Sequence, residues 1–180
     1  MPVHRRYTLY AVAYILMIYL TSGRIRDISN LIRQAFGDSL NLLVTVGLIF
    51  ILGWILFAFR HTFNRRKILP LCLVLLGYGL LLWWLAVPEE RIHLCQYGLL
   101  CALCHKAVPE RIQGWPRYGL VVLIVVLAGI GDELIQWLRP NRVGDVRDVL
   151  INSLAALQAQ ALIVIFQGSR LLPDASRQEL

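Results

Sequence analysis

The sequence is short of charged residues, which make up 16% of its 180 residues, whereas hydrophobic residues make up 58%. Its mean hydropathy is +0.62. Ordinary soluble domains carry about 25% charged residues, so this composition excludes that class. The apolar residues form long runs, and a chain of this length suffices for about six membrane helices with short loops. We therefore expect a single integral membrane domain over residues 1–180.

Cysteine is scarce, and its placement predicts no disulfide framework. Cys72, Cys95, Cys101 and Cys104 lie inside or at the edges of apolar runs, where a thiol behaves as a small hydrophobe. Residues 101–105 match C-x-x-C-H, the pattern of covalent haem attachment, but no soluble domain surrounds them to form a haem crevice. A zinc site from the same residues lacks a second ligand cluster of matching type. We expect no cofactor and no metal.

Other absences narrow the class further. No A-x-A-like cleavage site follows the first apolar run, so that run is interpreted as a retained segment and not as a signal peptide. The runs show no period-two alternation, which excludes strands. The net charge of +7 is divided among short clusters between apolar runs and does not form one basic face, so we expect no nucleic-acid partner.

The apolar runs themselves predict the fold, an all-α polytopic transmembrane bundle of about six spans. The first and fourth runs are shorter and more polar than the others, so we expect them to be tilted, partly buried or less deeply inserted. The six runs are Tyr7 to Leu20, Leu40 to Phe59, Ile68 to Val87, Ile92 to Val108, Tyr118 to Leu138, and Val149 to Phe166.

Residues 24–38 are too polar to span a membrane. Apolar residues recur there at helical spacing with arginines between them, which predicts an amphipathic helix. This helix either lies on the outer membrane surface or caps the bundle.

Charge bias predicts the orientation. If the N-terminus is inside, the inner segments hold eleven of the eighteen basic residues but three of the eleven acidic ones. Basic residues favour the cytoplasmic side, so both termini are expected in the cytoplasm. Trp83, Trp84, Trp115 and Trp137 fall near expected span ends, where interfacial aromatic residues are common.

Polar residues mark the outer end of the fourth run. Glu89, His93 and Tyr97 follow one another at steps of four, so they share one stripe of a helix. The fifth run ends, and the sixth begins, at the same side of the membrane, so their polar ends should meet this stripe. That convergence depends only on the antiparallel connectivity.

The fifth and sixth runs supply further polar groups at this level. Asp132, Glu133 and Gln136 lie in the last turns of the fifth run, and Asp148 and Asn152 lie one turn apart at the start of the sixth. Together with the fourth run they form a candidate functional cluster at the outer end of three helices. It consists of Glu89, His93, Tyr97, Glu133, Gln136, Arg142, Asp148 and Asn152.

Two interpretations of the cluster stay open. In the first, a structural or assembly subunit uses it as an ion-pair network, with Glu133 satisfied by Arg142, at about 0.6 kcal/mol per interhelical hydrogen bond. In the second, it is a polar pocket open to a headgroup or an envelope polymer, because it holds more ionisable groups than packing requires. Such a pocket also allows acid–base chemistry by His93 and Glu133, although nothing identifies a nucleophile. A transporter is disfavoured because no broken midplane helix is indicated.

The same residues resemble the VanZ-like family of small integral membrane proteins. The family pattern has an acid, His and Tyr at four-residue steps, then Glu-x-x-Gln, an arginine-containing turn, and Asp-x-x-x-Asn opening the last helix. The eight cluster residues match it, and the resemblance covers roughly Val87 to Ala161 (residues 87–161), the VanZ-like core. The chain departs from it at Glu90, where a basic residue is common, and at Ala155 and Ala159, where glycines are usual.

The resemblance implies a multi-pass protein of the bacterial cytoplasmic (inner) membrane. The family's namesake lowers susceptibility to the glycopeptide antibiotic teicoplanin, whose targets are extracytoplasmic. An outward polar pocket that contacts a membrane lipid, or a lipid-linked or peptidoglycan-related ligand, fits that implication. The rivals are a membrane-embedded acid/base enzyme acting on a lipid or lipid-linked substrate, and the structural subunit described above.

Overall fold

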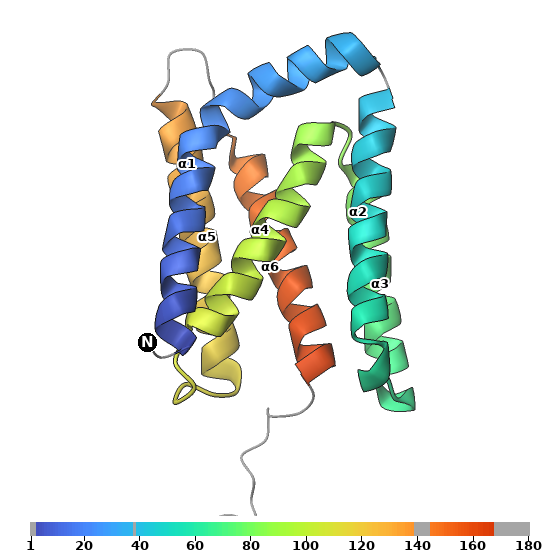
Figure 1. Cartoon of the computed structure of the whole chain (residues 1–180), viewed down its shortest axis with the longest axis vertical. Coiled ribbons are helices and arrows are strands. Elements are labelled where there is room, and N and C mark those ends of the chain that lie inside the picture. The colour runs from blue at the N-terminus through green and yellow to red at the C-terminus, as the bar shows by residue number, and fades with distance from the viewer. Residues whose placement is uncertain (1–2, 38, 139–144, 168–180) are drawn as a thin grey trace, which may run out of the picture.

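The structure is a computed structural model that describes residues 3–37, 39–138 and 145–167. Within these ranges the chain is helical and forms no strand, which confirms the expected all-α class (Figure 1). The elements are α1 (Val3–Phe36), α2 (Ser39–Ala58), the short 3₁₀ helix η1 (Arg60–Thr62), α3 (Arg65–Trp84), α4 (Pro88–Ala107), α5 (Trp115–Trp137) and α6 (Val146–Gln167).

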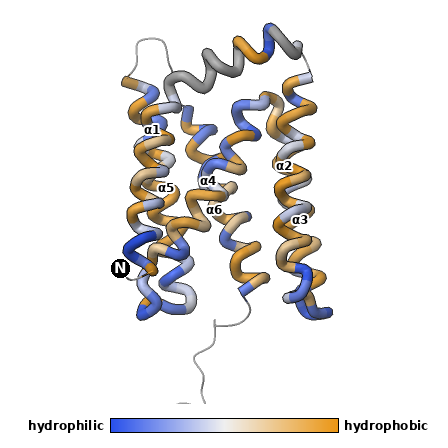
Figure 2. The backbone as a smooth tube through the Cα atoms, in the orientation of Figure 1, coloured by the Kyte–Doolittle hydropathy of each residue, from blue (hydrophilic) through white to orange (hydrophobic). Residues whose placement is uncertain are grey.

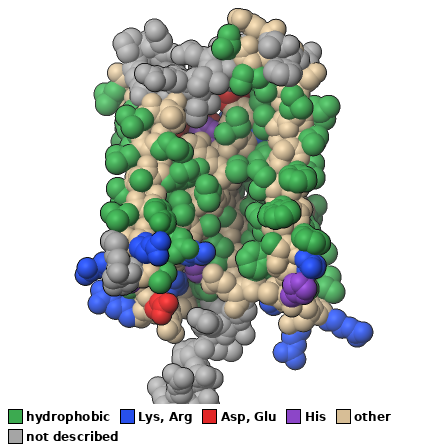
Figure 3. Space-filling view, viewed as in Figure 1, with side chains coloured by type: hydrophobic (Ala, Val, Ile, Leu, Met, Phe, Trp, Pro, Cys, Tyr) green, Lys and Arg blue, Asp and Glu red, His purple; other side chains and the backbone are tan. Residues whose placement is uncertain are grey.

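Within the described residues, four helices are long and apolar enough to cross a membrane, namely α2, α3, α5 and α6. α1 and α4 run alongside them but are more polar, as the first and fourth runs indicate (Figure 1). Apolar side chains cover the middle of the molecule, and Lys and Arg gather at one end of the visible face (Figure 3). This distribution is typical of a multi-pass membrane protein.

α4 is the central helix and packs against α1, α5 and α6. Small residues allow its close contact with α6: a Cβ atom at Gly98 would lie 3.8 Å from the Cβ of Ala159. Ala155 is fully buried in the same interface. The alanines that replace the family's usual glycines therefore still permit close helix packing.

α2 and α3 lie to one side of this core and are apolar around most of their surface (Figure 2). A helix that is apolar all round and exposed in the protein is typical of contact with lipid. One end of this pair is joined to α6 by aromatic rings, since Phe59 stacks on Phe166 at 4.8 Å between ring centroids and Phe63 meets the same ring at 5.8 Å.

Specific residues fix where the helices begin and end. They thereby bring the polar ends of α4, α5 and α6 to the same side of the bundle. Gly37 follows α1 with a φ of 57°, the left-handed conformation common after a helix, and its N–H bonds the carbonyl of Arg33. The side chain of Asn64 caps α3 by accepting from the N–H of Lys67. α4 begins at Pro88, because proline fits the first turn of a helix. The start of α4, the end of α5 and the start of α6 consequently lie at the same end of the bundle (Figure 1).

α1 is longer than the first apolar run and bends, so that its second part passes over this end of the bundle towards α2 (Figure 1). Thr21 and Ser22 return hydrogen bonds to carbonyls of the preceding turn, an arrangement that favours bending. Arg33 pairs with Glu89 at 3.3 Å, and this contact favours the capping alternative for residues 24–38. The side chains of residues 23–30, 35 and 36 lie outside the described part, and with them most of the expected apolar face.

Candidate functional site

His93 lies at the meeting point of α4 and α6. Its Nδ1 is 2.7 Å from Oδ1 of Asn152, and its ring is parallel to that of Tyr97, with 5.8 Å between centroids. The stacking follows from the four-residue step, which puts both rings on one stripe of α4. His93 is half-buried, whereas Tyr97 and Asn152 are fully buried. The imidazole therefore stands between a buried polar core and the exterior.

Tyr97 connects this pair to α5. Its hydroxyl donates to Oδ2 of Asp132 at 3.2 Å, and Asp132 is 1% exposed. Asp132 also interacts electrostatically with His93 and with Asp148. α1 contributes from the other side, because the hydroxyl of Tyr19 donates to the carbonyl of Ala128 at 3.0 Å. Ser22 of α1 also forms a side-chain hydrogen bond with Asp132, so four helices surround this buried carboxylate.

The hydrogen-bond partners of Glu133 differ from those of its neighbour Asp132. Gln136 Nε2 donates to its Oε1 at 3.1 Å, and the backbone N–H of Asp145 donates to its Oε2 at 3.0 Å. The glutamate therefore ties the end of α5 to the residue that precedes α6. Arg142 lies outside the described residues, so its expected pairing with Glu133 stays a prediction.

Two buried atoms of the site have no hydrogen-bond partner among the described residues: Oδ1 of Asp132 and Nδ2 of Asn152. One accepts and the other donates. Tyr97 bonds the carboxylate of Asp132 and packs with Asn152 around Gly129, where a Cβ atom would lie 3.5 Å from the tyrosine ring and 3.2 Å from the asparagine. Buried polar atoms in native proteins are nearly always paired, so this acceptor and this donor each lack a partner that packing alone would normally supply.

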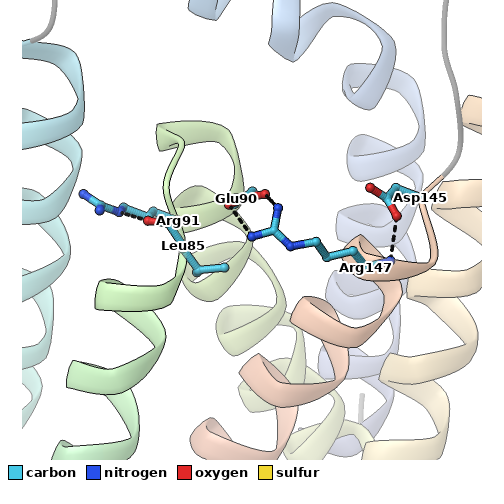
Figure 4. Close-up of polar contacts among 5 residues, drawn as sticks. All are labelled: Leu85, Glu90, Arg91, Asp145 and Arg147. Atoms are coloured by element: carbon cyan, nitrogen blue, oxygen red, sulfur yellow. Dashed lines mark hydrogen bonds and ion pairs between the residues drawn. The ribbon is translucent and has the colours of Figure 1, made fainter.

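Two arginine side chains make polar contacts at the first turn of α4 (Figure 4). Arg147 of α6 donates to Glu90 from both terminal guanidinium nitrogens and lies over the ring of Trp84 at 4.9 Å. Arg91 turns the other way, donating to the carbonyl of Leu85 at 2.9 Å and also to Thr45 of α2. Glu90 thus has a charge partner in this chain, although the position departs from the family pattern.

The structure brings part of the expected cluster into contact. His93, Tyr97 and Asn152 touch, while Glu133 and Gln136 form a separate pair on α5. Asp148 interacts electrostatically with both α5 carboxylates. Glu89 pairs instead with Arg33 of α1.

Asp132, the carboxylate that Tyr97 bonds, is not among the eight residues of the cluster expected from the sequence. A signal for it existed in the spacing. Val121, Val125 and Ala128 form the buried stripe of α5, and Asp132 continues the same stripe by one more turn. Glu90 and Arg147 carried no such signal, because partners on different helices are set by packing.

A second network of hydrogen-bonded side chains lies at the opposite end of the α4–α6 interface. Cys101 donates to Oε1 of Gln160 at 3.2 Å, and Gln160 Nε2 is 3.1 Å from Nδ1 of His105. His105 Nε2 is 3.0 Å from Oε1 of Gln167, so both of its ring nitrogens are engaged with glutamines. Across the ranges described, no three His, Cys, Asp or Glu side chains lie close enough to hold a metal ion. This end of the interface is therefore a packed hydrogen-bond network.

Comparison with known protein families finds a match over most of the chain. The family model described as VanZ/LLP1 matches residues 7–167, which is wider than the resemblance over residues 87–161 indicated. No curated protein and no solved structure matches the chain. The match reaches all six long helices, including the three that build the polar site. The chain therefore belongs to the VanZ/LLP1 family.

Proposed function

We propose that the polar end of α4, α5 and α6 is an outward-facing site that binds the headgroup of a cell-envelope component. The component is a membrane lipid or a lipid-linked peptidoglycan precursor, in a bacterial cytoplasmic membrane with both termini inside. The observation that carries the proposal is the pair of unpartnered buried atoms, Asp132 Oδ1 and Asn152 Nδ2, beside the half-buried His93. An effect on glycopeptide susceptibility would follow if the bound component were the precursor that such antibiotics recognise.

The energetics support a ligand of this kind. A buried donor or acceptor left without a partner costs roughly 1–3 kcal/mol, so a group that satisfies both atoms binds favourably. A hydroxyl or an amide can accept from Asn152 and donate to Asp132, whereas a phosphodiester or a fully ionised phosphate has no proton to donate to the carboxylate. Sugar and peptide headgroups of envelope precursors are rich in hydroxyls and amides. They match the site better than a purely anionic headgroup does.

Acid–base catalysis on the same ligand is the second candidate. It is favoured by one observation, the placement of a half-buried imidazole against a tyrosine that bonds a buried carboxylate. The imidazole of His93 and the carboxylate of Asp132 interact electrostatically, and both are groups that can exchange a proton with a ligand. The acid–base pair would then be His93 and Asp132, since Glu133 is already engaged by Gln136 and by the backbone of Asp145.

Ligand-dependent thermal stability of the purified protein in detergent tests the proposal. We expect a lipid-linked disaccharide–peptide precursor to raise the melting temperature, and undecaprenyl phosphate, which lacks the sugar and peptide, to raise it less. Asp132→Asn keeps one oxygen that accepts from Tyr97. It puts an NH₂ group, which donates, in place of the unpartnered acceptor Oδ1. It should weaken precursor binding about tenfold, the value of one hydrogen bond of about 1.4 kcal/mol.

The matched control is Asp145→Asn, which removes the same charge from an exposed residue at the same end. It should bind like the wild type. Equal weakening by both variants, or no stabilisation of the wild type by the precursor, would contradict the proposal. Loss of folded protein in Asp132→Asn alone would favour the structural interpretation. For the catalytic candidate, His93→Asn should abolish conversion of the precursor, followed by mass spectrometry, while binding is retained.

A further inference from the structure

A strongly basic segment lies at the end of the bundle opposite the polar site. It comprises η1 and the first turn of α3, and we call it the cationic tip: Arg60, His61, Arg65, Arg66 and Lys67. The sequence contains no Asp or Glu between Asp38 and Glu89, so the entire α2–α3 hairpin carries no acid to balance these residues. Among the described residues, no carboxylate pairs with Arg60, Arg65, Arg66 or Lys67.

The backbone adds to this uncompensated charge. The N-terminus of a helix carries a partial positive charge, which acidic residues in the first turn usually offset. The first turn of α3 has three basic residues and no acidic one. Each of these charges is repelled by the others and by the helix end. An anion that binds there relieves the repulsion.

The aromatic residues next to the tip fix it against the bundle. Phe59 and Phe63 pack on Phe166 at the end of α6. The guanidinium of Arg60 lies 4.0 Å from the ring centroid of Phe57 and donates to the carbonyl of that residue. The backbone that carries the basic side chains is therefore held in place by packing. This lowers the conformational entropy lost when the side chains bind a ligand.

The surroundings identify the anion. Ile68 and Leu69, directly after the basic turn, are 55% and 70% exposed, and Phe57 on the other side is 57% exposed. These apolar side chains belong in hydrocarbon, so the basic residues between them stand at the level of the lipid headgroups. Clusters of basic residues beside a membrane helix are typical binding sites for anionic lipids, each residue contributing about 1 kcal/mol.

We propose that the cationic tip is a binding site for anionic phospholipid headgroups in the leaflet next to it. The bound headgroups hold the α2–α3 hairpin, which is largely exposed to lipid, in place against α6. This role is independent of the polar site at the other end of the bundle and does not need its ligand.

The test compares phosphatidylglycerol with phosphatidylcholine in mixed micelles containing the full chain. Phosphatidylglycerol should raise the melting temperature at low salt, and phosphatidylcholine should not. The variant Arg65→Gln/Arg66→Gln/Lys67→Gln should require about a hundredfold more phosphatidylglycerol for the same shift, at roughly fivefold per basic residue removed. The charge-preserving variant Arg65→Lys/Arg66→Lys should behave like the wild type, which separates loss of charge from loss of fold.

The chain also offers a control with the same loss of charge at the same end. Arg5, Arg6 and Arg111 are exposed, and the variant Arg5→Gln/Arg6→Gln/Arg111→Gln removes three charges there. It should keep most of the phosphatidylglycerol effect. Equal weakening by both triple variants would overturn the proposal in favour of diffuse charge attraction. So would an equal response of the wild type to both lipids, or an equal stabilisation by inorganic phosphate alone.

Discussion

Residue 129 is a glycine, and two residues of the site, Asn152 and Tyr97, occupy the space that a larger side chain would need. A Cβ atom there would lie 3.2 Å from Cβ and Nδ2 of Asn152 and 3.5 Å from the ring of Tyr97. The contacts with Asn152 are tighter than most Cβ contacts in proteins, so the asparagine would have to shift by a few tenths of an ångström. Gly129 therefore lets α5 approach α4 and α6 closely enough for Tyr97 to reach Asp132.

This gives a prediction with a control on the same helix. Gly119 lies on an exposed face of α5 with nothing within 4 Å of the added Cβ, so Gly119→Ala should stabilise the protein by about 1 kcal/mol through helix propensity. Gly129→Ala gains the same propensity but displaces Asn152, so we expect it to be at least about 1 kcal/mol less stable than Gly119→Ala. Thermal unfolding in detergent measures both. Equal gains would mean that the space around Gly129 is not restrictive.

The neighbours Asp132 and Glu133 show what spacing can and cannot predict at the residue scale. The i, i+3 step correctly indicated that Glu133 and Gln136 share a face, and they bond at 3.1 Å. The step from one residue to the next rotates a side chain by about 100° around the helix, so the two carboxylates point to different partners. Which of them faces Tyr97 depends on how α5 is rotated against α4. That rotation is set by packing, which the sequence does not state directly.

At the scale of elements, the first turn of α4 connects most of the bundle. Glu89 contacts α1, Glu90 contacts α6, and Arg91 contacts α2. Acidic residues suit the first turn of a helix because they face its positive end, whereas Arg147 in the first turn of α6 does not. The pairing of Glu90 with Arg147 therefore offsets an unfavourable charge in α6 while joining the two helices.

Exchanging the two charges tests this pair. Glu90→Gln and Arg147→Gln should each lower the unfolding free energy by about 1 kcal/mol, the upper end for pairs of limited burial. The reversed pair Glu90→Arg/Arg147→Glu should recover part of the loss, because the attraction is restored. The control is Arg33→Gln, whose side chain is 46% exposed and should matter less. Additive losses in the reversed pair would show that the two charges are not coupled.

Hydropathy predicted the positions of the six long helices but not where they end. Each of the six runs lies within one of the six long helices, apart from residues at some run ends. α1 continues to Phe36 because backbone hydrogen bonds propagate through polar residues as readily as through apolar ones. α3 begins at Arg65 because Asn64 caps it, a local signal that apolar runs do not contain. The uniformly apolar composition of α2, in contrast, does account for its large exposed surface.

At the scale of the whole molecule, charge separates the two ends of the bundle. The start of α1, the α2–α3 turn and the α4–α5 turn lie at one end, and the sequence makes all three basic (Figures 1 and 3). The buried carboxylates Asp132 and Glu133 lie at the other. Trp84 and Trp137 end their helices at the carboxylate end, and Trp115 begins α5 at the basic end, as expected for interfacial aromatic residues. The basic end is therefore the one expected in the cytoplasm.

Labelling of single cysteines on intact cells tests this orientation. We expect a membrane-impermeant maleimide to react with Asn141→Cys, in the connection between α5 and α6, before lysis. It should react with Gln113→Cys, in the exposed connection between α4 and α5 at the opposite end, only after lysis. The four native cysteines are replaced by alanine or serine beforehand.

The labelling result bears on the site itself, because the two connections are joined by one helix that crosses the whole bundle. If Gln113→Cys reacted first, the polar site would face the cytoplasm, where no extracytoplasmic envelope ligand could reach it. His93, Tyr97 and Asp132 would keep their contacts, but the proposed outward orientation of the site would be wrong, and with it any ligand found only outside the cell. The cationic tip would then face the outer leaflet, and its affinity for anionic lipid, measured in micelles, would be unchanged. The orientation thus decides what the polar site can bind, whereas the chemistry of the tip is independent of it.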